Sequence, residues 1–304
     1  MTTLTAANSP PAASDGKDAP ADLTARMRAE IRNIGIPPRP ALLDEIDREM
    51  RREAPDFKHL ADVIGADVGL SASLIKVANS PYYGFAKKVR SVPETLLVLG
   101  LRIVTRTVAG LALQQVFPHV PSLERFWDSA ARTARVSGWL AQRLKGRIAL
   151  RPDDAYTLGL FRDCGIALLM IPFAEYAQIL QQANRETARS FTEVEDALLS
   201  INHAIVGAEL AEDWLLPDEI HEAIRHHHDR AAIEGSSAAP LPTATRQLMA
   251  LCQVAEYLIQ RTTGMSQTHE WAKLGEACLG ALEIAPEELD ALLADCREVV
   301  NADI

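Results

Sequence analysis

Apolar residues recur with helical spacing along almost the whole chain. Leu43, Ile46 and Met50 fall on one face of a segment that begins after Pro40, and similar spacings of three and four return in the later segments. No segment shows the clean alternation of apolar and polar residues that is typical of a half-buried strand. The pattern therefore predicts an all-α protein, a multi-helix bundle arranged as two packed lobes.

Proline and glycine mark the breaks between the predicted helices. Residues 36–40, "IPPRP", cannot be helical throughout and are expected to form an extended connector. Residues 79–85, "NSPYYGF", have turn chemistry. Ser91 is placed to cap a short helix with Pro93 in its first turn, and Gly100 should end that helix. These signals indicate a first lobe of short helices that closes with one longer apolar helix.

Four regions follow from this pattern. Residues 1–22 are rich in Ala, Ser, Pro and Asp, have little to bury, and are expected to form a disordered tail. Residues 23–118 form the predicted N-terminal helical lobe, and residues 119–264 form the second lobe. Residues 265–304 are expected to add C-terminal helices packed on the second lobe.

Composition narrows the class of protein. Hydrophobic residues make up 48% of the chain and aromatic residues 5%, which favours helices packed on helices. The net charge of −10 gives no overall attraction to phosphate backbones, so a nucleic-acid partner is not expected. The four cysteines lack C-x-x-C spacing and are interpreted as buried free thiols of a reducing cytoplasm. We expect no secretory signal, no membrane-spanning run and a cytoplasmic location.

The stretch "YTLGLFRDCGIALL", residues 156–169, resembles a buried apolar helix with one charged pair in its middle. That pair is Arg162 and Asp163. Moving a charged side chain from water into the protein interior costs on the order of several kcal/mol, unless a partner of opposite charge compensates it. Arg162 could extend from a helix surface with Asp163 in water, or the pair could belong to a site.

Other metal-ligand-type side chains also lie in the second lobe. Imidazole and carboxylate suit Zn, Fe and Mn, and metal sites in helical bundles are built from side chains on facing helices. The candidate pocket residues are Asp128, Arg162, Asp163, His203, His227, His228 and Glu256. Tyr82, Tyr83 and Phe85 belong to the first lobe, either as core aromatics or as the lining of a groove between the lobes.

Several blocks in this chain are similar to the HDOD family. They are "IPPRPALL", "ANSPYYGF", "FWDSAARTA", "LFRDCGIALL", "INHAIVGAELAEDWLLPDEIHEAIRHHHD" and "VAEYL", which occur in the family's order across about residues 31–264. The family is related to the HD-domain phosphohydrolases, including the HD-GYP enzymes. The resemblance therefore implies that the second lobe is HD-like.

The resemblance also implies which metal ligands have been lost. HD enzymes would have histidine at Asp128, a His-Asp pair at Arg162–Asp163, and aspartate near Glu256. The extra histidines of two-metal members would fall at His203 and within the run from His226 to His228, at His227 or His228. Of the core four ligands, only Asp163 is retained.

Arginine cannot ligate a metal, since it has donors only and stays protonated. The hypothesis is that Arg162 replaces the ion and is held by carboxylates from Asp128, Asp163 and Glu256. Together with the broken ligand set, the resemblance implies a non-catalytic bacterial signal-transduction module that contacts a regulatory protein partner and needs no cofactor. Two alternatives stay open: a metal-dependent phosphohydrolase acting on nucleotides or cyclic dinucleotides, and a sensor that binds a nucleotide second messenger without hydrolysis. A residual metal site would use Asp163, His203, His227 and His228.

Overall fold

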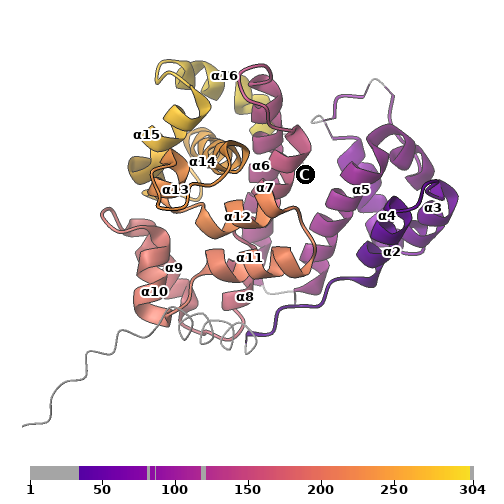
Figure 1. The fold of residues 1–304 in the computed structure, drawn as a ribbon, viewed down its shortest axis with the longest axis horizontal. Helices are drawn as coiled ribbons and strands as arrows, with labels where there is room; N and C mark the ends of the chain where they lie inside the picture. The colour runs from indigo at the N-terminus through magenta and orange to yellow at the C-terminus, as the bar shows by residue number, and fades with distance from the viewer. Residues whose placement is uncertain (1–33, 81–82, 86, 118–120, 302–304) are drawn as a thin grey trace, which may run out of the picture.

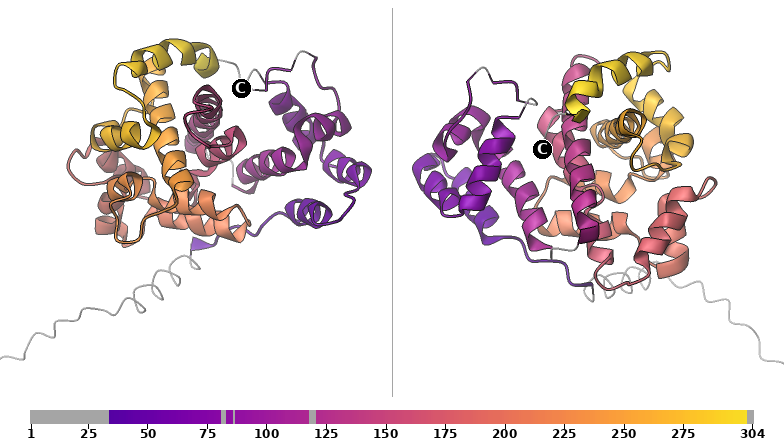
Figure 2. Two further views of the ribbon diagram at one scale, coloured as in Figure 1. Left: turned by 45° about the horizontal axis from the view of Figure 1, so that its top comes forward. Right: turned by 180° about the vertical axis from the view of Figure 1, so that it is seen from behind.

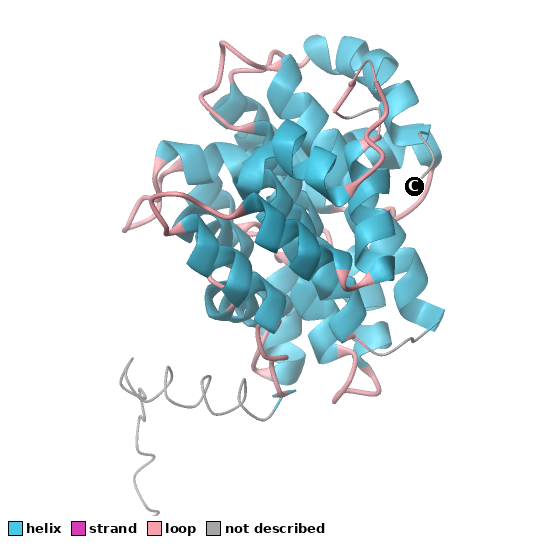
Figure 3. Ribbon diagram, turned by 90° about the vertical axis from the view of Figure 1, so that its right-hand side faces the viewer, coloured by secondary structure: helices cyan, strands magenta, loops and turns pink. Residues whose placement is uncertain are grey.

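Helices form the regular secondary structure throughout the described part of the chain (Figure 3). The computed structural model describes residues 34–80, 83–85, 87–117 and 121–301, and within these ranges it contains no β-strand. The all-α prediction is confirmed. The predicted tail at residues 1–22 lies outside the described residues. The first helices are α2 (Ala41–Met50), α3 (Phe57–Gly65), α4 (Val68–Ala78) and α5 (Val92–Val116).

The remaining helices form the larger part of the molecule, in which α14 has a central place. It contacts α6, α7, α12, α13, α15 and α16. In Figure 1, α2, α3 and α4 lie together on one side, and the helices from α6 onward lie on the other. The bounds of these later helices are α6 (Pro121–Arg143), α7 (Pro152–Phe161), α8 (Cys164–Leu169), α9 (Tyr176–Arg185), α10 (Phe191–Leu199), α11 (His203–Asp213), α12 (Asp218–His226), α13 (Arg230–Glu234), α14 (Thr243–Thr263), α15 (Glu270–Leu282) and α16 (Glu288–Asn301).

One hydrophobic core runs through both sides of the molecule, and the two views in Figure 2 show α5 reaching from the α2–α4 side toward α7. The C-terminal helices α15 and α16 pack on α14. The four cysteines are free and buried within this structure. The exact region boundaries at residues 118 and 264 stay predictions.

The turn and cap signals act as the sequence indicates. The Ser91 side chain accepts a hydrogen bond from the backbone N–H of Glu94 at 3.3 Å, with proline in the first turn of α5. Gly100 has φ +76° and ψ 161°, so the helical path is interrupted inside α5. Residues 35–40 carry no regular secondary structure, as expected of a connector.

The expectation that no apolar run could span a membrane was wrong for α5. By length and composition alone, Val92–Val116 is long and apolar enough to cross a bilayer, with a mean hydropathy of 1.8 over its most apolar window. Half of that window is buried inside the protein, and Gly100 breaks the helix. The buried residues of α5 belong to the main hydrophobic core.

The connector at residues 36–40 fastens the α2 side to the rest of the protein. Trp214, buried at the end of α11, donates its indole N–H to the Pro37 carbonyl at 3.1 Å. In return, Arg39 donates from Nε to the Trp214 carbonyl at 2.9 Å. A second link joins α5 to α7, where Arg106 lies 2.9 Å from Asp153.

The Arg162–Asp163 pair does not lie inside one continuous helix, contrary to the expectation for residues 156–169. Helix α7 ends at Phe161 and α8 begins at Cys164, so the pair occupies the break. The break allows α8 to cross α11 at very short range. A Cβ placed on Gly165 would lie 2.0 Å from the His203 carbonyl oxygen and 2.8 Å from the Gly207 nitrogen. Glycine at this crossing therefore brings Asp163 close to His203.

We predict that Gly165→Ala destabilises the protein by about 1–3 kcal/mol or more, because its Cβ would meet backbone atoms that cannot rotate away. Gly280→Ala is the matched control. It lies exposed within α15 with no atom within 4 Å of its added Cβ, so it should gain about 0.4–1 kcal/mol. Urea denaturation of both variants measures the difference. Equal stabilities for the two would contradict the close crossing.

Candidate functional site

Arg162 is the buried cation of this site. Its residue exposure is only 4%, although it follows directly on the end of α7. Its Nη2 donates to Asp163 Oδ2 at 3.0 Å and to Glu256 Oε2 at 3.1 Å, and its Nε lies 3.3 Å from the same Asp163 oxygen. Glu256 comes from α14, so this guanidinium joins two elements that lie far apart in the sequence.

Asp128 does not take part in this ion pair. It is exposed on α6, which begins at Pro121 rather than beside Trp127, and no ion pair joins it to Arg162 among the residues described. It nevertheless lines the same cavity of about 550 Å³ as Arg162 and Glu256. The structure thus supplies two of the three expected carboxylate partners, and the third lines the cavity without pairing with Arg162.

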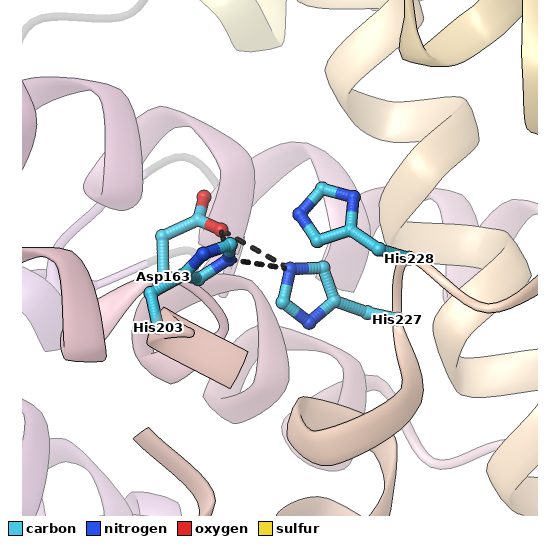
Figure 4. Close-up of side chains that lie close together, drawn as sticks. All are labelled: Asp163, His203, His227 and His228. Atoms are coloured by element: carbon cyan, nitrogen blue, oxygen red, sulfur yellow. Dashed lines mark hydrogen bonds and ion pairs between the residues drawn. The ribbon is translucent and has the colours of Figure 1, made fainter. Parts of the chain in front are cut away.

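Four ligand-type side chains converge in one place (Figure 4). One donor atom from each of Asp163, His203, His227 and His228 lies within 4.8 Å of all the others. Asp163 Oδ1 lies 3.4 Å from His227 Nε2 and 3.7 Å from His203 Nε2. These four residues, here called the histidine cluster, are the ones that the sequence offered as a residual metal site.

Local structure explains how each histidine reaches the cluster. His203 is the first residue of α11, whose N-cap Asn202 accepts from the backbone N–H of Ile205 at 3.0 Å. His227 and His228 follow the end of α12 and are buried. His226 is the last residue of α12, half-exposed, and pairs with surface carboxylates instead. Two of the three consecutive histidines therefore face the cluster.

Each clustered imidazole is oriented by an acceptor at its other nitrogen. His203 Nδ1 lies 2.7 Å from Glu195 Oε2, and His228 Nδ1 lies 2.6 Å from Glu270 Oε2. His227 Nδ1 lies 2.6 Å from the Ile224 carbonyl oxygen. Because these acceptors require N–H at Nδ1, the Nε2 lone pairs are left to face the cluster. Metal-bound histidines are oriented in the same way.

Neighbouring charges and burial shift the pKa values of several groups in and around the cluster. Burial would raise the pKa of Asp163, but Arg162 and His227 overcome it and hold that pKa well below its usual range. Burial and the neighbouring His228 lower the pKa of His227 to about 3, so it stays neutral. Glu270 has its pKa lowered to about 2, since His228 and Lys273 outweigh its burial. The cluster thus offers an ionised carboxylate and a neutral imidazole at ordinary pH.

The contact between His203 and His227 calls for a cation. Their Nε2 atoms are 3.3 Å apart, and with both Nδ1 atoms protonated two lone pairs would face each other. A proton can bridge them, and the pKa of His203 is raised because Glu195 outweighs its burial. A divalent transition-metal ion also satisfies both atoms, and three imidazoles with one carboxylate are donors that suit Zn, Fe or Mn. The residues present therefore fit such an ion.

Several residues of the site were missed by sequence reasoning. Glu195 is fully buried in α10, and Tyr176 of α9 donates its hydroxyl proton to it in a short hydrogen bond. The helical spacing of Phe191, Val194 and Glu195 places this carboxylate on the apolar face of α10, which was a usable signal. Glu270 begins α15, outside the predicted HD-like region, and carried no comparable signal.

Tyr83 and Phe85 are not among the residues that line this cavity. Tyr82 is outside the described residues. Tyr83 stacks on Phe85 with ring centroids 6.0 Å apart, and burial raises the pKa of Tyr83, with Tyr156 of α7 and Thr107 of α5 also acting on it. Tyr83 therefore lies where α5 meets α7. A role in an inter-lobe groove stays a prediction.

Comparison with known proteins agrees with this architecture. The HDOD domain family matches residues 36–230, more than half of the chain, and the protein belongs to that family. A solved HDOD domain protein of unknown function from Geobacter sulfurreducens shares the fold with a TM-score of 0.62 and 22% identity, covering 91% of this chain and 98% of that one.

Two further relatives were found. A Shewanella amazonensis SB2B protein, provisionally named a phosphohydrolase, has a TM-score of 0.67 at 20% identity, covering 91% of this chain and 96% of that one. An uncharacterised protein of Treponema pallidum (strain Nichols) is 25% identical over 209 residues, which are 68% of this chain. The match spans only 40% of that relative's length. At these identities the solved structures establish the fold alone.

We predict that Arg162→Ala lowers the free energy of unfolding by about 3–5 kcal/mol, because Asp163 and Glu256 lose their buried partner. Arg162→Lys keeps the charge but not the planar guanidinium that donates to both carboxylates, so the decrease in the free energy of unfolding should be smaller. Arg225→Ala is the control. Its pair with Glu209 at 3.1 Å is partly exposed and should contribute less than about 1 kcal/mol. If denaturation midpoints of Arg162→Ala matched the parent, the counter-ion role of Arg162 would fail.

Proposed function

We propose that this HDOD protein is a non-catalytic regulatory module of signal transduction that works by contact with another protein. The observation that carries this proposal is Arg162, whose guanidinium is bound by Asp163 Oδ2 and Glu256 Oε2. The family resemblance puts a histidine ligand at this position in HD phosphohydrolases. A fixed cation there occupies Asp163 Oδ2 and Glu256 Oε2, and it leaves Asp163 Oδ1 to face the histidines.

The histidine cluster is proposed to bind one divalent transition-metal ion. Asp163, His203, His227 and His228 would be its ligands, with Glu195 and Glu270 orienting two of the imidazoles. Four protein donors are the number found in closed, structural zinc sites, whereas catalytic sites keep a position open for water. When bound, such an ion would supply charge and rigidity to the site.

Loss of hydrolysis follows from the chemistry of Arg162. Metal-dependent hydrolysis needs a bound water whose pKa is lowered to near neutrality, and two-metal sites stabilise both the attacking and the leaving oxygen. Arg162 supplies positive charge but no coordination position. The site is thus suited to hold a ligand and not to cleave one.

The alternative is a metal-dependent phosphohydrolase, which the histidine cluster itself favours. In that case the cavity of about 550 Å³ would admit the substrate, with Arg125 and Arg132 among its lining residues. The cytoplasmic location and the partner protein belong to the regulatory proposal as well. Elemental analysis combined with activity assays separates the two functions.

We predict one bound ion per chain after loading with Zn²⁺ or Mn²⁺ and desalting, and no turnover of cyclic dinucleotides or nucleoside phosphates. His227→Ala should reduce ion affinity by more than about 10–100-fold, the loss typical of an outer-shell change, because it removes a direct donor. His226→Ala is its neighbouring control and should bind the ion as the parent does, since His226 faces away from the cluster.

Two ions per chain with phosphodiesterase turnover would overturn the regulatory proposal in favour of the enzyme. One ion without turnover supports it. Retention of the ion by His227→Ala would show that the histidine cluster is not the binding site.

A further inference from the structure

Helices α9 and α10, with the loop between them, form a hairpin at residues 176–199 that projects beside the body of the protein (Figure 1). Ala183, Phe191 and Val194 make a small hydrophobic cluster of their own, separate from the main core. Tyr176 and Ile179, near the start of α9, belong to the main core. The base of the hairpin is therefore anchored by apolar packing, whereas its outer part needs other contacts.

Those other contacts run to the histidine cluster. Phe191 packs edge-on against His203, with centroids 5.3 Å apart, and stacks on His228 at 5.0 Å with an angle of 15° between the rings. Glu195 accepts from His203 Nδ1 at 2.7 Å. The outer part of the hairpin thus contacts two of the three imidazoles that the proposed ion would hold.

The loop of the hairpin is tied to the cluster by a second route. Lys273 of α15 donates to the Arg189 carbonyl oxygen at 3.0 Å, and the same ammonium forms a short ion pair with Glu270. Glu270 in turn holds His228 Nδ1 at 2.6 Å. Two chains of contact, through Glu195 and through Lys273, therefore connect this hairpin to His203 and His228.

We propose that the α9–α10 hairpin is a metal-dependent switch, closed on the body when a divalent transition-metal ion holds the histidine cluster and loosened when the ion is absent. The inference rests on the proposed ion site and adds its regulation. With the ion bound, the rings of His203 and His228 are held in place. Phe191 and Glu195, which contact these rings, then have fixed partners. Without the ion, His203 and His228 lose this common bond, and the 3.3 Å contact between the Nε2 atoms of His203 and His227 remains.

The loop of the hairpin and the start of α10 border a second cavity, which lies between the hairpin and the body. This cavity, of about 910 Å³, is lined by Ser190 and Thr192 of the hairpin and by Arg230 and Lys273 of the body. His228 and Glu270 line both cavities. Movement of the hairpin would therefore change the second cavity whenever the state of the cluster changes.

Hydrogen–deuterium exchange of the full chain tests the switch, with chelated protein compared with protein loaded with Zn²⁺ alone. We expect slower exchange in peptides covering residues 176–199 on Zn²⁺ binding, by up to about 100-fold at an ion concentration 100 times the Kd. Peptides from α2–α4 should change little. Phe191→Ala should still bind one ion but lose most of the protection of the hairpin, whereas Leu198→Ala, half-exposed on α10, should behave as the parent.

The outcomes separate the switch from the ion site. One bound ion with unchanged exchange in the hairpin overturns the switch and leaves the ion site standing. Equal slowing in every peptide also overturns it, since the effect would then be global stabilisation. Absence of any bound ion removes the site and the switch together.

Discussion

The carboxylate of Asp163 is shared between two sets of partners, and the rest of the site depends on that division. Its Oδ2 accepts from Arg162, while its Oδ1 faces the Nε2 atoms of His203 and His227. A single acidic group thus joins a permanent cation to a place where an exchangeable cation can bind. Its location follows from the break between α7 and α8 and from the glycine crossing at Gly165.

Charge balance around the cluster follows from the same division. Four carboxylates surround it, and Arg162 and Lys273 are the two fixed cations bound to them among the described residues. The carboxylates are Asp163, Glu195, Glu256 and Glu270. If the imidazoles are neutral, the formal charges of these four carboxylates and two cations add up to −2, which one divalent cation would balance. Without the ion, protonation of His203, whose pKa Glu195 raises, supplies part of the balance. Buried charges need such compensation because desolvation is costly.

Sequence reasoning reached the fold and named the residues of the histidine cluster, but it did not find the residues that support them. Helical periodicity and breakers such as Gly65 and Gly100 fix local structure through a few neighbouring residues, so they could be interpreted in advance. The resemblance supplied His203, His227 and His228. The separation of Asp128 from Arg162 depends on the rotation of α6, and the role of Glu270 depends on where α15 packs. Both are set by tertiary packing, which no local pattern encodes.

The arrangement implies that ion binding and hairpin position must influence each other in both directions. In the proposed switch, the ion favours the closed hairpin by fixing the rings that Phe191 and Glu195 contact. A partner protein that binds only the closed hairpin must then raise the affinity of the site for the ion, by the same factor by which the ion raises the affinity for the partner. Arg162 takes no part in this exchange, because its charge is constant and its partners are Asp163 and Glu256. In the proposed switch, the fixed charge of Arg162 would confine the effect of ion binding to the side of Asp163 that faces the histidines.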